Sequence, residues 1–316
     1  MAMTEITGAK LKSGRSTDFL KMQKKFWQLH LLILLPLAYI ILFHYAPMYG
    51  VQIAFKKFRP SVGVWDSPWI GLKHFETLFR SYEFSRLIRN TLTLSFTNLI
   101  VGFPFPILLA IGINELLSKW YRKAVQLITY APYFISTVVI IGIVNQLLDS
   151  RLGPLSMIIQ NLGGQPVEWL KEPGAFVPIY VTTSIWQNAG YTAILYIAAL
   201  TSIDLCLYEA AIMDGASKLQ RIWYIDLPAI MPTAVTLLIL SVGYVMNVGY
   251  DKALLLQNNF NIETSEIISV YVYKIGLVQN NPAFATAVGL FNSIVNVFLV
   301  VTVNKISKKV SGVSLW

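Results

Sequence analysis

The sequence predicts an all-α membrane protein with six transmembrane helices and both termini in the cytoplasm. Of its 316 residues, 55% are hydrophobic and 13% charged, and the mean hydropathy is +0.57. A water-soluble domain has no use for that much apolar surface. Several apolar segments exceed the ~18 residues that a helix needs to cross a bilayer. Basic residues gather in both tails, and an even number of spans returns the chain to its starting side.

The apolar segments set the expected organisation of the chain. Residues 1–25 form a cytoplasmic tail, 48–90 an extracytoplasmic amphipathic segment, 91–304 a five-helix core domain, and 305–316 a second cytoplasmic tail. The spans are expected near 26–47, 91–115, 125–148, 177–201, 230–250 and 283–304. The cytoplasmic side is assigned by the basic residues of the tails, which are Lys10, Lys12, Arg15, Lys21, Lys24, Lys25, Lys305, Lys308 and Lys309.

Amide and aromatic side chains interrupt the apolar spans, whereas charged side chains are almost absent from them. The candidates are Trp186, Gln187, Asn188 and Tyr191 in the fourth span, Tyr244 and Asn247 in the fifth, and Asn292 and Asn296 in the sixth. An amide that faces lipid is costly, so these groups should face helices or a cavity. Two interpretations stay open, namely hydrogen bonds between helices and a polar, aromatic route for a sugar.

The segment 204–229 is a charged stretch between the fourth and fifth apolar segments. Its first part, from Tyr208 to Met213, suits a short helix, and Gly215 permits a sharp turn. Ser217 can cap a second helix that runs to about Asp226. Pro228 and Pro232 are then expected to mark a break before the fifth span. The segment is therefore predicted to be a helix–turn–helix element at the membrane surface.

The same segment carries the pattern EAA-x3-G-x9-I-x-LP. This pattern resembles the signature of the permease subunits of ATP-binding-cassette (ABC) importers, and the resemblance implies a type I importer permease fold. It also implies that the segment docks on a separate ATPase, which binds ATP and Mg, so that this chain itself needs no cofactor. The implied docking residues are Glu209, Ala210, Ala211, Ile212, Met213, Asp214, Gly215, Ile225, Leu227 and Pro228.

A second resemblance indicates which class of substrate to expect. Residues 45–58 read YAPMYGVQIAFKKF, and 67–75 read SPWIGLKHF. Both stretches are similar to the permease branch that imports complex oligo- and polysaccharides, including alginate and pectin fragments. The resemblance implies a multi-pass protein of the bacterial inner membrane that forms a route for oligo- or polysaccharide, anionic uronates such as alginate included. Its implied partners are a second homologous permease, two ATPase subunits, an extracytoplasmic solute-binding protein and membrane lipid.

Other classes of function fit the sequence less well. The chain has no Gly-x4-Gly-Lys-Ser/Thr loop and no hydrolase motif, so we expect a transport subunit and not an enzyme. Its net charge of +9 is read as a membrane-orientation signal and not as nucleic-acid binding, and one cysteine gives no metal site. Alternatives are an ABC permease for peptides or amino acids and an ion-driven secondary transporter. The second would usually place ionisable residues at the membrane midplane.

The segment between the first two spans is basic and aromatic. From Val51 to Asn90 it holds seven basic residues against three acidic ones, with Lys56, Lys57 and Arg59 close together. One interpretation is an amphipathic segment at the lipid interface. The other is a cationic entrance that attracts a uronate chain, an attraction that salt would screen.

Overall fold

The computed structural model describes residues 26–312 and 314, and it divides the chain into two compact units, Met1–Gln52 and Ile53–Trp316. The basic tail of residues 1–25 lies outside the described residues. The described part of the first unit is one helical run, made of α2 (Trp27–Ile40), the π-helical turn η1 (Ile41–Tyr45), α3 (Ala46–Met48) and the start of η2 (Tyr49–Phe55). Its large apolar side chains are exposed, as expected of a helix that lies in lipid.

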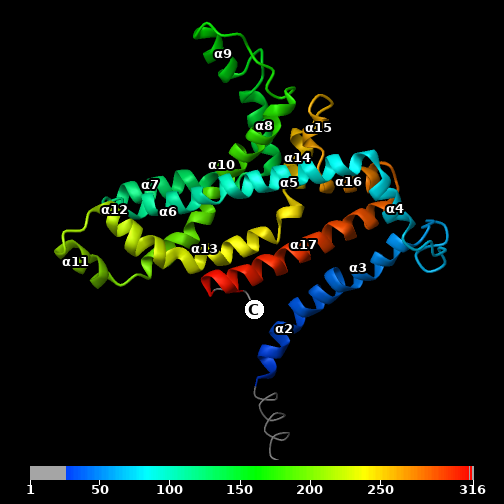
Figure 1. Ribbon diagram of the computed structural model, residues 1–316, viewed down its shortest axis with the longest axis horizontal. Coiled ribbons are helices and arrows are strands. Elements are labelled where there is room, and N and C mark those ends of the chain that lie inside the picture. The colour runs from blue at the N-terminus through cyan, green and yellow to red at the C-terminus, as the bar shows by residue number, and fades with distance from the viewer. Residues whose placement is uncertain (1–25, 313, 315–316) are drawn as a thin grey trace, which may run out of the picture. The chain divides into compact units, whose positions relative to one another are not determined.

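The second unit is built from helices. Its longer elements are α4 (Lys73–Arg80), α5 (Tyr82–Gly102), α6 (Pro104–Asn114), α7 (Lys119–Tyr130), α8 (Thr137–Leu147), α9 (Pro154–Asn161), α10 (Phe176–Thr201), α11 (Leu205–Met213), α13 (Leu227–Val242) and α17 (Pro282–Ser311). The short elements are η3 (Ala131–Phe134), η4 (Pro173–Ala175), α12 (Lys218–Arg221), η5 (Ile222–Asp226), η6 (Val245–Asn247), α14 (Tyr250–Leu256), α15 (Ile262–Ser265), α16 (Ile268–Tyr273) and η7 (Lys274–Val278). Figure 1 shows α13 and α17 running side by side.

Among the described residues, four helical runs are long and apolar enough to cross a membrane, or up to six if each bent pair counts as one span. The four are Trp27–Phe55, Tyr82–Asn114, Lys218–Val242 and Pro282–Lys309. The bent pairs are Lys119–Phe134 with Thr137–Leu147, at 102°, and Pro173–Thr201 with Leu205–Met213, at 72°. The predicted all-α membrane fold is confirmed.

Several helix boundaries differ from those expected. The second span begins at Tyr82 and not near 91, because the Ser81 hydroxyl accepts a hydrogen bond from the Glu83 N–H and caps the helix. The third is broken at Ile135–Ser136, where Ser136 caps α8. The fifth ends at Val242, and the expected last turns, 243–250, form irregular chain around η6. The break after Val242 brings the backbone of η6 into hydrogen-bond contact with α17.

Helix α10 lies at the centre of the second unit, where it packs against α5, α6, α7 and α13. The close approach to α7 depends on Gly190, because a Cβ atom there would lie 2.0 Å from the Thr129 carbonyl oxygen. Small residues let membrane helices approach in this way. The buried residues Ala110, Ala193 and Tyr196 continue the same packed core. The core thus fixes α10, which carries half of the predicted pathway residues.

Candidate functional site

The predicted docking segment folds as two short helices joined by a tight turn. The Asp204 carboxylate accepts a 3.0 Å hydrogen bond from the Cys206 N–H and caps α11. At the other end, Gly215 has φ of +76°, a left-handed conformation that glycine adopts without steric cost. Its N–H donates to the Ile212 carbonyl at 3.0 Å, and the Ala216 N–H donates to the Ala211 carbonyl at 2.9 Å. This pair of bonds is a Schellman motif, which ends α11 sharply.

The second arm starts with a capping box. Ser217 accepts from the Gln220 N–H, and the Gln220 side chain accepts from the Ser217 N–H at 2.7 Å. The helix then continues through α12, η5 and α13, so the expected break at Pro228 and Pro232 is wrong. The π-helical turn η5 ends two residues before Pro228, as η1 does before Pro47. A π-turn lets the helix pass a proline that cannot donate its own hydrogen bond.

The two arms expose a row of large apolar side chains. Met213, at the tip of α11, is 86% exposed. The others are Leu205, Leu207, Ile212, Leu219, Trp223 and Tyr224. Exposed apolar side chains on these two short helices are compatible with the predicted docking surface. Glu209, Ala210 and Asp214 are exposed on the same arm, as a docking role requires.

Not every residue of the motif belongs to this exposed surface. Leu227 is half-buried and packs against the core of α6 and α10, and Ile225 is also half-buried. The Tyr208 hydroxyl donates to the carboxylate of Asp226, which is buried. This bond joins α11 to η5. The end of the motif therefore anchors the two arms to the spanning helices, and its beginning stays exposed, as the predicted docking role requires.

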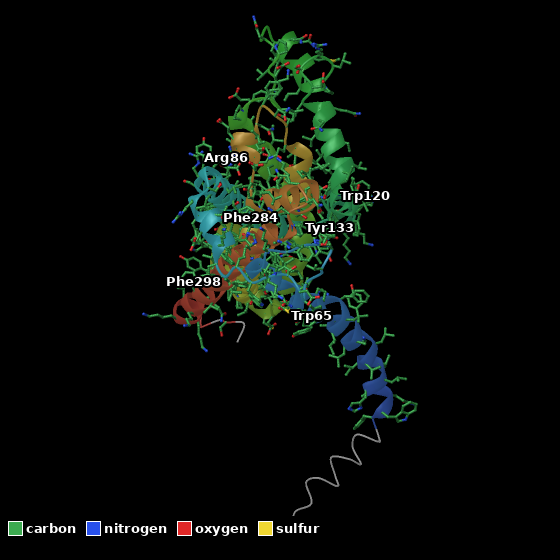
Figure 2. All side chains as sticks on the ribbon, turned by 90° about the vertical axis from the view of Figure 1, so that its right-hand side faces the viewer. Trp65, Arg86, Trp120, Tyr133, Phe284 and Phe298 are labelled. Carbon is green, nitrogen blue, oxygen red and sulfur yellow. The ribbon has the colours of Figure 1, made fainter. Side chains whose placement is uncertain are left out.

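A cavity of about 680 Å³, lined by both apolar and polar side chains, opens between α5, α6, α10, α13 and the chain around η6. Five of the predicted pathway residues line it: Gln187, Asn188, Tyr191, Tyr244 and Asn247. Tyr191 stacks on Tyr133, with ring centroids 3.8 Å apart, and Figure 2 labels Tyr133. Amides and aromatic rings are the groups that bind sugar hydroxyls and the apolar faces of sugar rings.

The structure does not bring Trp186, Asn292 and Asn296 into this cavity. Asn292 donates to the Asn247 side chain at 2.8 Å and to the Met246 carbonyl at 3.2 Å. Asn296 accepts from the Met246 N–H at 3.3 Å. These bonds satisfy the backbone of η6, which has left the helix. The two asparagines of α17 thus hold the wall of the cavity in place and make the interhelical bonds of the first interpretation.

Two charged residues of the cavity were missed from the sequence. Lys252 and Asp251 lie just beyond the expected end of the fifth span, at residue 250, and both line the cavity. The helix breaks earlier, at Val242, so the chain turns back and α14 reaches the cavity. The glycine and asparagine around η6, a weak helix-ending signal, could have indicated this turn.

The basic residues of the 48–90 segment have different surroundings. Lys57 and Arg59 are exposed, but Lys56 is only 3% exposed and donates to the carbonyls of Val64 and Trp65 at 2.8 and 3.2 Å. Its ammonium also lies 4.9 Å from the centre of the Trp69 ring. Lys56 therefore holds the loop together, and Lys57 and Arg59 remain as the exposed charges of the predicted entrance.

An exposed apolar segment between membrane-length helices and a cavity with amide and tyrosine side chains both fit the predicted membrane permease. Residues 102–312 match the family described as binding-protein-dependent transport system inner membrane component, and the chain belongs to this family.

Two relatives from Bacillus subtilis match most of the chain. The chain is 38% identical over 299 residues to Protein LplB of Bacillus subtilis, covering 95% of this chain and 94% of LplB. It is 42% identical over 281 residues to the polygalacturonan/rhamnogalacturonan transport system permease protein YteP of the same organism, covering 89% and 88%.

A solved structure gives the same assignment. A chain of a bacterial ABC transporter involved in the import of the acidic polysaccharide alginate superposes with a TM-score of 0.86 at 41% identity, covering 93% of this chain and 99% of that one. The protein is therefore a sugar or polysaccharide permease of an ABC importer. The family, the type I fold and the carbohydrate class predicted from the sequence are confirmed.

Proposed function

We propose that this chain forms, with a second homologous permease, the route by which a bacterial inner-membrane importer takes up an acidic oligosaccharide. The observation that carries the proposal is the similarity over nearly the whole chain to two permeases of acidic-polysaccharide systems, one for alginate and one for polygalacturonan. Alginate and polygalacturonan are both polyuronates, with one carboxylate on each uronate unit. The amide- and tyrosine-lined cavity supports a sugar route.

The energy comes from partners in this proposal. Two ATPase subunits bind ATP and Mg and hydrolyse the ATP, and the exposed face of α11 and α12 docks on them. This chain itself is a transport subunit. A solute-binding protein delivers the sugar, as the alginate transporter has been solved with a periplasmic protein that carries an alginate pentasaccharide. Lys57 and Arg59 would attract that anionic sugar at the entrance.

The test of substrate class is a reconstituted importer in proteoliposomes with its own binding protein. An oligogalacturonate or alginate oligosaccharide should raise ATP hydrolysis about tenfold more than a neutral oligosaccharide of the same length, because only the acidic sugar matches the proposed route. High salt should weaken this preference by screening. Equal stimulation by both sugars, or stimulation by the neutral sugar alone, would reject an acidic substrate.

Cys206 tests the orientation of the docking segment. It is exposed on α11 and is the one cysteine of the sequence, so a thiol label has a single target. In spheroplasts that express the permease without its ATPase, a membrane-impermeant maleimide should leave Cys206 unlabelled, and it should label Cys206 in inverted vesicles. The Cys206→Ser variant gives the background. Labelling in intact spheroplasts would place the docking segment outside and remove the basis for ATPase coupling.

A further inference from the structure

Lys252 presents a nearly buried cation to the cavity that Gln187 and Asn188 line. The residue is 5% exposed, and its ammonium donates to the Ser184 hydroxyl at 3.0 Å. The same ammonium lies 5.6 Å from the centre of the Tyr180 ring. An ammonium has three N–H donors, and Ser184 accepts one of them. Lys252 can therefore bind a further acceptor in the cavity without giving up this anchor.

Its position is set by a close contact between α10 and the start of α14. A Cβ atom at Gly249 would lie 2.3 Å from the Tyr180 hydroxyl oxygen, so only glycine allows this approach. The Tyr180 hydroxyl donates to the Gly249 carbonyl at 3.4 Å. Three residues later, Lys252 meets Ser184, one helical turn along α10 from Tyr180. The ammonium is thus held by the fold and does not hang freely into the cavity.

The charge of Lys252 lacks an ionic partner among the described residues. None of the carboxylates there forms an ion pair with it, although the exposed Asp251 lines the same cavity. Burial lowers the pKa of the Lys252 ammonium to about 8. The group is still mostly protonated at pH 7, at a cost in free energy that a nearby anion would offset. Other buried cations of the protein are better compensated, since Lys56 has two carbonyl acceptors.

We infer that Lys252 is the residue of the cavity that selects for acidic sugars, by binding a uronate carboxylate of the substrate in transit. This inference rests on the proposed function, in which the cavity is the sugar route. The carboxylate would accept from the two remaining N–H donors of the ammonium, and the nearby tyrosines and amides would bind the ring and its hydroxyls. Asp251 would oppose the same anion, which keeps the binding weak enough for release.

Three variants in the complete reconstituted importer test this role. The substrates are a free-acid oligogalacturonate and its methyl ester, which has the same length and no carboxylate charge. Lys252→Gln should raise the KM for uptake of the acid about tenfold and leave the KM for the ester within about twofold, since a charged hydrogen bond is lost only for the acid. Lys252→Arg should keep the preference. Asp251→Asn, a charge change of the same size in the same cavity, should lower the KM for the acid alone.

The outcomes separate the two proposals. If wild type imports the acid but Lys252→Gln slows acid and ester equally, or changes neither, Lys252 is not selective and the inference fails while the proposed function stands. If wild type imports neither oligogalacturonate nor an alginate oligosaccharide, both fail. Should Lys252→Gln not assemble in detergent, Asp251→Asn decides, because an unchanged preference for the acid would overturn the role of cavity charge.

Discussion

Gly215→Pro should abolish coupling of this permease to its ATPase. Proline fixes φ near −65°, whereas residue 215 has φ of +76°, and proline removes the N–H that donates to the Ile212 carbonyl. The Schellman turn cannot form, so α11 loses its end and the exposed tip at Met213 is displaced. We expect ATPase subunits to be lost from the purified complex and substrate-stimulated hydrolysis to fall more than tenfold. Co-purification and ATPase assays in proteoliposomes measure this.

The chain offers a closely matched control at Gly163. This residue follows α9 with φ of +83°, and its N–H donates to the Gln160 carbonyl at 2.9 Å, while Gly164 donates to Ile159 at 2.8 Å. The turn is the same Schellman motif outside the docking segment. Gly163→Pro should therefore carry the same backbone strain and still retain the ATPase. If both variants keep the ATPase, or both lose it, the turn at Gly215 has no specific role in docking.

The docking segment could be predicted because its structure depends on local chemistry. Gly215, Ser217 and the residues between them determine a turn and a cap by contacts within a few residues. The same rules failed at Pro228. They predicted a break in the helix there, but the π-helical turn η5 lets the helix continue into α13. Local rules describe the first turn of a helix well, but a π-turn has no comparable sequence signature.

The cavity could be predicted only in part, because it depends on contacts between distant segments. The amides of α10 were recognised from their type. The sequence could not tell the amides that line the cavity, Asn188 and Asn247, from those that bind backbone groups. Asn292 and Asn296 bind the backbone of Met246, which lies outside any α-helix, and residue type alone does not predict such a contact. Lys252 was missed because the fifth span was expected to run to residue 250, whereas its helix ends at Val242. From sequence alone, a charged residue next to a span is assigned to the membrane interface. Only the fold shows that Lys252 faces the cavity.

Glu266 forms the most buried ion pairs of the described residues. Its side chain is 7% exposed and accepts from Arg86 on α5 at 2.6 Å and from Lys274 on η7 at 3.0 Å. Figure 2 labels Arg86, which is one of the seven basic residues between Val51 and Asn90. The Asn90 side chain adds a 3.1 Å bond to the Glu266 carbonyl. This cluster ties the second span to the chain between α15 and α17.

Glu266→Ala should be among the most destabilising single changes in the protein. It leaves the partly buried Lys274 without a carboxylate and Arg86 with only the 3.8 Å contact to Glu83. Breaking a buried ion pair in this way costs about 3–5 kcal/mol. We expect a loss of about 3 kcal/mol, at the lower end because both cations retain some solvent. The unfolding midpoint in detergent, followed by tryptophan fluorescence, measures it. The exposed pair Lys171–Glu168, at 2.7 Å, is the control, and Glu168→Ala should cost less than about 1 kcal/mol. Equal midpoints for the two variants would show that burial of Glu266 adds nothing to stability, and that the spans are held together by apolar packing alone.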